Sequence, residues 1–436
     1  MKKREEIDEK YKWDISGYAK SLDACEEELK KASSRFFEIS KFENQLNNEE
    51  NIYACLMLSS NISEQLEKLY VYSALKVREN AKDSKAVELN EKVGSACVNY
   101  STISSFIDVE IGEHNEEFLT DLMNNKNYPQ FRTYFKSILR HKKYLLSKKE
   151  EKLLSQMGEF TGGFSDIFDM FDNADVKFED AKDSKGEKHT LTHATYSLLV
   201  ESQDRELRKN AFKNINKAYG EYNNTIATTY NYNTKNDVVS ARVRKYDSAR
   251  QAALSGGNIP EEVYDNLISV VNEYLPVLHK YTALRKRVLG VDELKMYDIY
   301  VPLVQLPKKD IPYEEALKMM QEGLAPLGEE YLAQVDRGTK EGWIDVYENQ
   351  GKTSGAYSFG SYSSMPYILL NYTDTLKDVF TIVHEMGHSM HSYYTRKTQP
   401  YTYGDHSIFT AEVASTVNES LLMQHLLATE TDPEMR

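Results

Sequence analysis

Residues 89–107 read LNEKVGSACVNYSTISSFI and repeat apolar side chains at alternating intervals of four and three. The positions concerned are Leu89, Val93, Ala96, Tyr100, Ile103 and Ile107. An α-helix completes a turn every 3.6 residues, so this spacing gathers the apolar side chains into one stripe. Two earlier stretches step in the same way, at Leu22, Cys25, Leu29, Ala32, Phe36 and Ile39, and at Ile62, Leu66 and Leu69. These patterns predict a mostly α-helical fold of long antiparallel helices that pack by their stripes.

The distribution of proline agrees with this fold class. Only Pro129 of the ten prolines lies before residue 250, and proline breaks helices, so the first half can be nearly all helix. The polar stretch at residues 180–188, DAKDSKGEK, is typical of a break. We therefore expect an N-terminal helical domain at residues 1–190 and a second domain at residues 191–436.

The pattern changes near residue 343. Residues 343–347 alternate between apolar and polar side chains and residues 365–370 form an apolar run, so both predict short strands. A helix is expected to begin at Thr375 and to continue to about Tyr394, and a last helix is expected at residues 408–428. The sequence thus predicts a small β-sheet next to a long helix.

Composition excludes several classes of partner. The 436 residues include 54 Lys and Arg and 68 Asp and Glu, which gives a net charge of −14. An acidic protein is a poor ligand for the phosphate backbone of nucleic acids and for anionic membranes. No apolar run approaches the roughly 20 residues that span a bilayer, and the N-terminus lacks the apolar core of a secretory signal. With three cysteines, too few for a disulfide framework, these features lead us to expect a cytoplasmic protein; the oligomeric state stays open.

The sequence His384-Glu385-Met386-Gly387-His388 falls within the expected long helix. Positions i and i+4 share a helix face, so the two imidazoles can reach one metal ion. Glu385 lies about 100° further round, where its carboxylate can take a proton from a metal-bound water. HExxH is the pattern of catalytic zinc sites, but it also arises by chance, and a helix with two structurally satisfied histidines is the alternative.

A zinc site of this kind needs a third protein ligand, and five residues are candidates: His391, Asp405, His406, Glu412 and Glu419. His391 lies about 7.5 Å along the axis from the middle of the histidine pair, too far for the same ion. Glu412 is favoured because the small residues Ala411, Ala414 and Ser415 would let the last helix approach closely. Glu419, about two turns further on, could hydrogen-bond a ligand histidine or simply be solvated.

That last helix is also expected to have a core face. It would consist of Ile408, Phe409, Val413, Val417, Leu421 and Leu422.

Five stretches together resemble the M3 family of zinc oligopeptidases, and within it the oligoendopeptidase F subgroup. Two carry the metal motifs: TIVHEMGHSMHSYY at residues 381–394 and FTAEVASTVNES at residues 409–420. The others are EKYKWDIS at 9–16, YDSARQAALSGGNIPEEVYDNLI at 246–268 and GAYSFGSYSSMPYILLNYTDTLKDVFT at 355–381. The resemblance extends over essentially the whole chain.

The resemblance implies a mostly helical zincin-type peptidase with a deep cleft between two helical halves, which limits substrates to unstructured oligopeptides. It implies one zinc ion held by His384, His388 and Glu412, with Glu385 as the general base. It also implies that a strand near residues 355–358 presents backbone groups to the bound peptide. Family members continue past the position of residue 436 with a segment that stabilises the oxyanion, so the domain at 191–436 is expected to be truncated.

Three functions remain open at this point. The leading hypothesis is a zinc metalloendopeptidase that cleaves internal bonds of oligopeptides. A dipeptidyl carboxypeptidase of the same family would differ in where it cuts. A non-catalytic helical peptide-binding module would need a closed or absent zinc site, and a retained Glu385 argues against it. An N/N/O ligand set also accepts manganese or cobalt.

Overall fold

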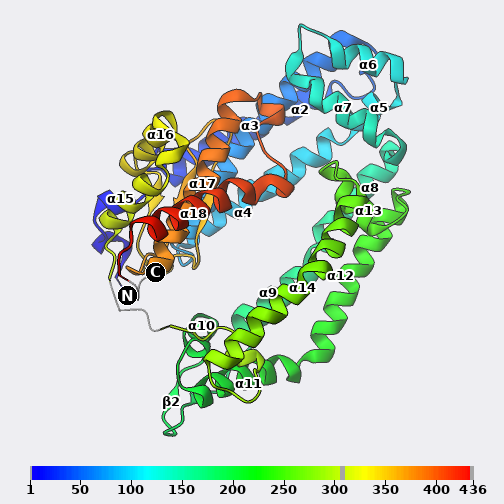
Figure 1. Ribbon diagram of the computed structural model, residues 1–436. Coiled ribbons are helices and arrows are strands. Elements are labelled where there is room, and N and C mark those ends of the chain that lie inside the picture. The colour runs from blue at the N-terminus through cyan, green and yellow to red at the C-terminus, as the bar shows by residue number, and fades with distance from the viewer. Residues whose placement is uncertain (1, 305–309, 433–436) are drawn as a thin grey trace. The chain divides into compact units, whose positions relative to one another are not determined.

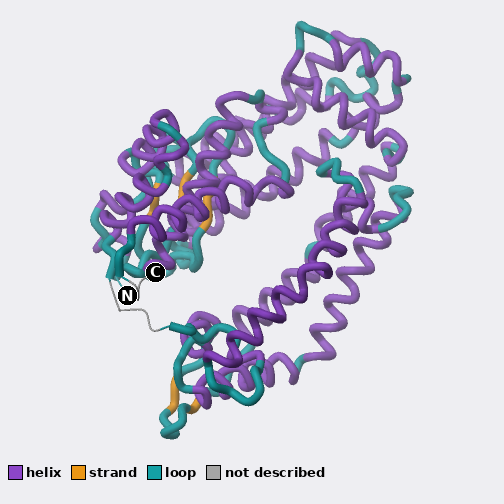
Figure 2. Tube along the Cα trace, viewed as in Figure 1, coloured by secondary structure: helices purple, strands orange, loops and turns teal. Residues whose placement is uncertain are grey.

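The computed structural model describes residues 2–304 and 310–432 (Figure 1). Helices dominate the described chain, and its strands are few and short, which confirms the predicted fold class (Figure 2). The chain forms two compact units: unit 1 comprises Met1–Gln156 and Lys308–Arg436, and unit 2 comprises Met157–Pro307. These units describe how the chain packs and not where functional domains begin, so the expected division after residue 190 remains a prediction.

The N-terminal part of unit 1 is a helical bundle. Its helices are α1 (Leu22–Ser34), α2 (Phe36–Ser40), α3 (Glu49–Glu79), α4 (Ser84–Ser104), α5 (Phe106–Glu113), α6 (Glu116–Asn124) and α7 (Arg132–His141), and α8 (Lys148–Thr161) spans the boundary with unit 2. The predicted stripe in residues 89–107 is confirmed, since Leu89, Val93, Tyr100 and Ile107 are buried in one core. A helix break at Ser105 divides that stripe between α4 and α5.

The C-terminal part of unit 1 has a core of its own. It contains the helices α15 (Tyr313–Gly323), α16 (Glu329–Lys340), α17 (Leu376–Thr398) and α18 (Ile408–Thr429), and the strands β3 (Ile344–Asp345), β4 (Tyr357–Phe359) and β5 (Tyr367–Leu369). The strands form a sheet in the order β3-β5-β4, with β3 parallel and β4 antiparallel to β5. β4 is therefore an edge strand, and it contacts α17.

Unit 2 is mostly helical as well. It contains α9 (Gly163–Met170), α10 (His193–Val200), α11 (Arg205–Glu221), α12 (Asn223–Val243), α13 (Ala249–Gly256) and α14 (Glu261–Val288), and the strands β1 (Ala181–Lys182) and β2 (Lys188–His189). β1 and β2 pair as an antiparallel hairpin within the break expected at residues 180–188. In the described chain, no helix combines the length and apolar character needed to cross a membrane.

The predicted core face of the last helix is wrong at four of its six positions, while Leu422 is buried and Leu421 packs against the core as expected. Ile408 is 86% exposed and Val413 is 57% exposed, and Phe409 and Val417 are also exposed. The buried residues of α18 are Ser415, Asn418 and Leu422. The reason is that α18 packs against α17 through its small and polar side chains, and this contact is not visible in the local apolar pattern.

Candidate active site

α17 places the two histidines of the HExxH sequence on one face. Thr375 caps the helix with its hydroxyl, and Asp378 completes a capping box. Val379, Ile382 and Val383 are buried on the opposite side, which fixes the rotation of the helix. As a result, the Nε2 atoms of His384 and His388 lie 3.1 Å apart.

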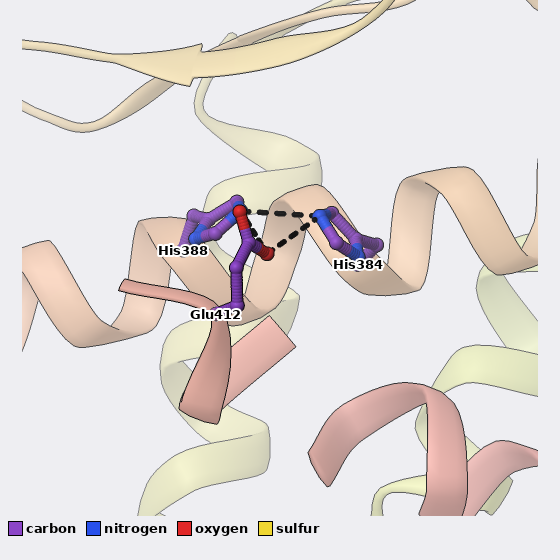
Figure 3. Close-up of side chains that lie close together, drawn as sticks. All are labelled: His384, His388 and Glu412. Carbon is purple, nitrogen blue, oxygen red and sulfur yellow. Dashed lines mark hydrogen bonds and ion pairs between the residues drawn. The ribbon is translucent and has the colours of Figure 1, made fainter. Parts of the chain in front are cut away.

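α18 brings Glu412 to this pair (Figure 3). Its Oε2 atom lies 3.3 Å from Nε2 of His384 and 3.4 Å from Nε2 of His388. The approach depends on Gly387, where a Cβ atom would stand 2.6 Å from Cα of Ser415 and 2.8 Å from the carbonyl oxygen of Ala414. The two helices can therefore meet closely only because Gly387 has no side chain.

The three ligand atoms fit a zinc ion. Zn–N and Zn–O bonds of about 2.0–2.1 Å in a tetrahedron place the ligand atoms roughly 3.3–3.4 Å from each other. The observed separations of 3.1, 3.3 and 3.4 Å form a triangle of this size. The ligand set of two imidazoles and one carboxylate leaves a fourth position for water, as catalytic zinc sites do.

Neighbouring side chains orient these ligands. Nδ1 of His384 donates a hydrogen bond to Oε1 of Glu419, so Nε2 carries the free lone pair that points toward Glu412. The hydroxyl of Ser415 donates to Oε2 of Glu412 at 2.8 Å. This hydrogen bond, together with the nearby histidines, lowers the pKa of Glu412 against the opposing effect of burial. The Glu412 side chain is 65% exposed, so solvent reaches this carboxylate.

Glu385 lies next to the histidines but in a drier environment. The residue is only 7% exposed. Burial raises the pKa of Glu385 to about 7, and the charge of Glu412 adds to the increase, while His384 and the backbone N–H of Ser358 oppose it. A carboxylate with a pKa near neutrality is suited to exchange protons near neutral pH.

The other candidate ligands lie elsewhere. His391 stacks on His406 with ring centroids 3.8 Å apart, and neither belongs to the cluster of three ligands. Nδ1 of His406 is 3.8 Å from Oδ1 of Asp405. Glu419, in contrast, hydrogen-bonds a ligand histidine, which favours the first of its two predicted roles.

Sequence reasoning missed Ser389, whose hydroxyl lies 2.8 Å from that of Ser358 on β4. The available signal was its position four residues after Glu385, which places both side chains on one helix face.

Comparison with protein families gives two matches. A profile of peptidase family M3 matches residues 198–436, and a profile described as Oligopeptidase F matches residues 110–178. The hairpin of β1 and β2 lies between the two matched ranges, whereas α17 and α18 lie in full within the first profile.

Individual relatives match nearly the whole chain. Oligopeptidase PepF of Bacillus subtilis (strain 168) is 41% identical over 99% of this chain and 65% of its own length. An oligoendopeptidase F homolog of Lactococcus lactis subsp. lactis (strain IL1403) is 42% identical over 100% of this chain and 73% of its own length. The solved structure of a predicted peptidase from Chlamydophila abortus has a TM-score of 0.84 and 34% identity, and the match covers 99% of this chain and 73% of that chain. The chain thus spans about two thirds to three quarters of the length of these proteins.

Proposed function

Because this chain belongs to peptidase family M3, we propose that it is a zinc metalloendopeptidase that hydrolyses internal bonds of short, unstructured oligopeptides. The observation that carries the proposal is the triangle of ligand atoms from His384, His388 and Glu412 beside the buried carboxylate of Glu385. The names of the relatives, oligopeptidase PepF and oligoendopeptidase F homolog, support peptides as the substrate class.

In this mechanism His384, His388 and Glu412 would hold the zinc ion. When bound, zinc lowers the pKa of a coordinated water and polarises the carbonyl of the scissile bond. Glu385 accepts a proton from the attacking water and passes it to the nitrogen of the leaving amine. Glu419 and Ser415 hold the metal ligands His384 and Glu412 in place while the proton is transferred.

The peptide would bind along β4. This strand is at the edge of the sheet, and α17 lies against it with Glu385 close to Ser358. An extended peptide can add to such an edge by backbone hydrogen bonds, which are independent of its sequence. This binding mode would hold a backbone carbonyl near the zinc ligands and accept many different peptides.

Cleavage of a mixture of unstructured peptides, followed by mass spectrometry, tests the proposal. The zinc-loaded chain is run beside its Glu385→Ala variant and a chelated sample. We expect internal cuts in the first sample and none in the other two, while the variant keeps one zinc ion per chain by elemental analysis. Cuts placed only two residues from the C-terminus would indicate a dipeptidyl carboxypeptidase. Turnover that survives Glu385→Ala, or a wild type that binds peptides without cleaving them, would refute the proposal.

A further inference from the structure

Two serine hydroxyls meet between α17 and the edge strand β4, and the mechanism above does not use them. Oγ of Ser358 lies 2.8 Å from Oγ of Ser389. Ser389 is 0% exposed, so its hydroxyl has no access to water and depends on partners within the protein. Ser389 follows Glu385 by one turn of α17, and both side chains therefore face β4.

Ser358 also lies next to Glu385 on this face of α17. Its backbone N–H is close enough to the Glu385 carboxylate to lower the pKa of that group. Ser358 thus meets two side chains that are four positions apart on the same helix. The bond between the two hydroxyls fixes the position of β4 on α17, beside the Glu385 carboxylate.

Because β4 is the edge strand of the sheet, the contact of Ser358 with α17 lies at the edge that is open to a peptide. Ser358 stands opposite Ile368 of β5, and its N–H lies near the carboxylate of Glu385. Its neighbours Tyr357 and Phe359 pack on the other side, against the core and under the guanidinium of Arg78. A change at Ser358 would therefore move the general base and the peptide-binding edge together.

We propose that Ser389 is a positioning residue, which holds Ser358 by its hydroxyl and so sets the position of the Glu385 carboxylate and of the edge of β4. The expected effect on turnover rests on the proposed function. The hydroxyl of Ser389 bonds Ser358 and is not one of the proposed zinc ligands. Its loss should therefore slow turnover without releasing the metal.

The experiment compares Ser389→Ala, Ser358→Ala and the double variant with the wild type, all loaded with zinc. Because misplacing a catalytic group by about 1 Å can cost up to 10²-fold in rate, we expect kcat to fall about tenfold in each single variant. KM should change less than kcat, and the zinc content should stay at one per chain. The double variant should be no slower than either single variant, since both remove the same contact.

The matched control is Ser73→Ala. Ser73 is also 0% exposed, and its hydroxyl bonds the carbonyl oxygen of Tyr70 and the side chain of Asn90 on the N-terminal bundle. It tests the loss of a buried hydroxyl away from the site, and we expect its kcat to match the wild type. An unchanged kcat in Ser389→Ala, an equal loss in the Ser73 control, or additive losses in the double variant would each overturn the proposal.

Hydrogen exchange separates this inference from the proposed function. The amides of residues 357–359 should exchange faster in Ser389→Ala and Ser358→Ala than in the wild type, and at the wild-type rate in Ser73→Ala. If the wild type proved inactive while this difference was observed, the proposed function would fail and the positioning role would stand. Equal exchange in all four proteins would refute the positioning role, whatever the activity.

Discussion

Two clusters of possible metal ligands in the described chain invite comparison. His384, His388 and Glu412 bring three ligand atoms within 4.8 Å of one another on α17 and α18. Asp183, Glu187 and His189 do the same on the hairpin of β1 and β2. By distance and by residue type both could hold a metal ion, so the difference between them has to lie in how their ligand atoms are already bonded.

In the hairpin cluster both oxygens of the Asp183 carboxylate already have hydrogen-bond partners. Oδ1 of Asp183 accepts hydrogen bonds from the backbone N–H groups of Lys185 at 2.9 Å and Glu187 at 2.8 Å, and Oδ2 lies 3.3 Å from Nε2 of His189. A metal ion bound through Oδ1 would have to break the bonds that shape the turn. In the helical cluster Nδ1 of His384 is bonded to Glu419, and Oε2 of Glu412, which faces both histidine Nε2 atoms, accepts one side-chain hydrogen bond, from Ser415. The two clusters thus differ in how far hydrogen bonds already occupy the lone pairs of their carboxylates.

The largest effect is expected from removing a ligand. His388→Ala should lower zinc affinity about 10²–10³-fold, because a binding energy of about 10–16 kcal/mol for a closed zinc site is shared among roughly four ligands. Calorimetric titration of the chelator-treated chain with zinc measures this change. The hairpin variant His189→Ala is the control and should bind one zinc ion as the wild type does. Loss of zinc from the hairpin variant would show that the two clusters had been ranked wrongly.

A smaller effect is expected from the residue that orients a ligand. Glu419→Gln replaces the charged acceptor of the His384 hydrogen bond by a neutral amide, and it should lower zinc affinity about 10–100-fold. The same titration measures it, with Asp183→Asn as the corresponding change in the hairpin. Equal affinities for Glu419→Gln and the wild type would mean that Glu419 is only a solvated charge.

The next largest effect is expected from disturbing the close contact of α17 and α18. Gly387→Ala would place a methyl group 2.6 Å from Cα of Ser415, so α18 must move and Glu412 with it. Overpacking of this kind costs about 1–3 kcal/mol, and we expect a lower melting temperature together with a zinc affinity reduced about tenfold. Thermal unfolding and zinc titration give the two values.

Gly94→Ala provides the control for that variant. Gly94 is also in a helix, but no atom lies within 4 Å of the position that its Cβ would occupy. Alanine has the higher helix propensity, so this variant should be more stable by about 0.5–1 kcal/mol. A destabilised Gly94→Ala, or an unaffected Gly387→Ala, would contradict the role given to the close contact of α17 and α18.

Local helix geometry accounts for what could be predicted of the site. The i, i+4 spacing placed His384 and His388 together, and the small residues of the last helix pointed to Glu412. Both predictions depend on a few neighbouring positions, and the structure brings these three residues together. The bonding of Glu419 to His384 was one of two stated alternatives.

Contacts between distant segments account for what could not be predicted. The apolar pattern of residues 408–422 indicated a buried face that holds only at Leu421 and Leu422, because α18 approaches α17 at Gly387 through its small side chains. The hydroxyl pair of Ser358 and Ser389 joins a strand to a helix 31 positions away, and the position of Ser389 one turn after Glu385 does not indicate which strand it meets. Periodicity thus predicts elements and near neighbours, but not which face of an element meets its partner.

The smallest expected effect concerns the protonation of Asp183. Burial raises the pKa of this carboxyl, but hydrogen bonds from His189 and the two backbone amides outweigh it and lower the pKa below the ordinary value of 3.8. A lowered pKa means that folding favours the charged form. The contribution of this carboxylate to stability is therefore present above pH 3.8 and is lost as the pH falls through the lower folded value.

Selective ¹⁵N labelling of glutamate makes this visible at the amide of Glu187. We expect a change of its chemical shift below the ordinary pKa of an aspartate, where the carboxylate that accepts this N–H becomes protonated, and this change should be absent in Asp183→Asn. One equivalent of zinc at pH 7 should leave the shift unchanged, because Oδ1 of Asp183 already accepts this N–H and Oδ2 already faces His189. A zinc-dependent shift of the Glu187 amide at one equivalent would show instead that the turn opens for a metal ion, and that hydrogen bonds already made within a cluster do not prevent metal binding.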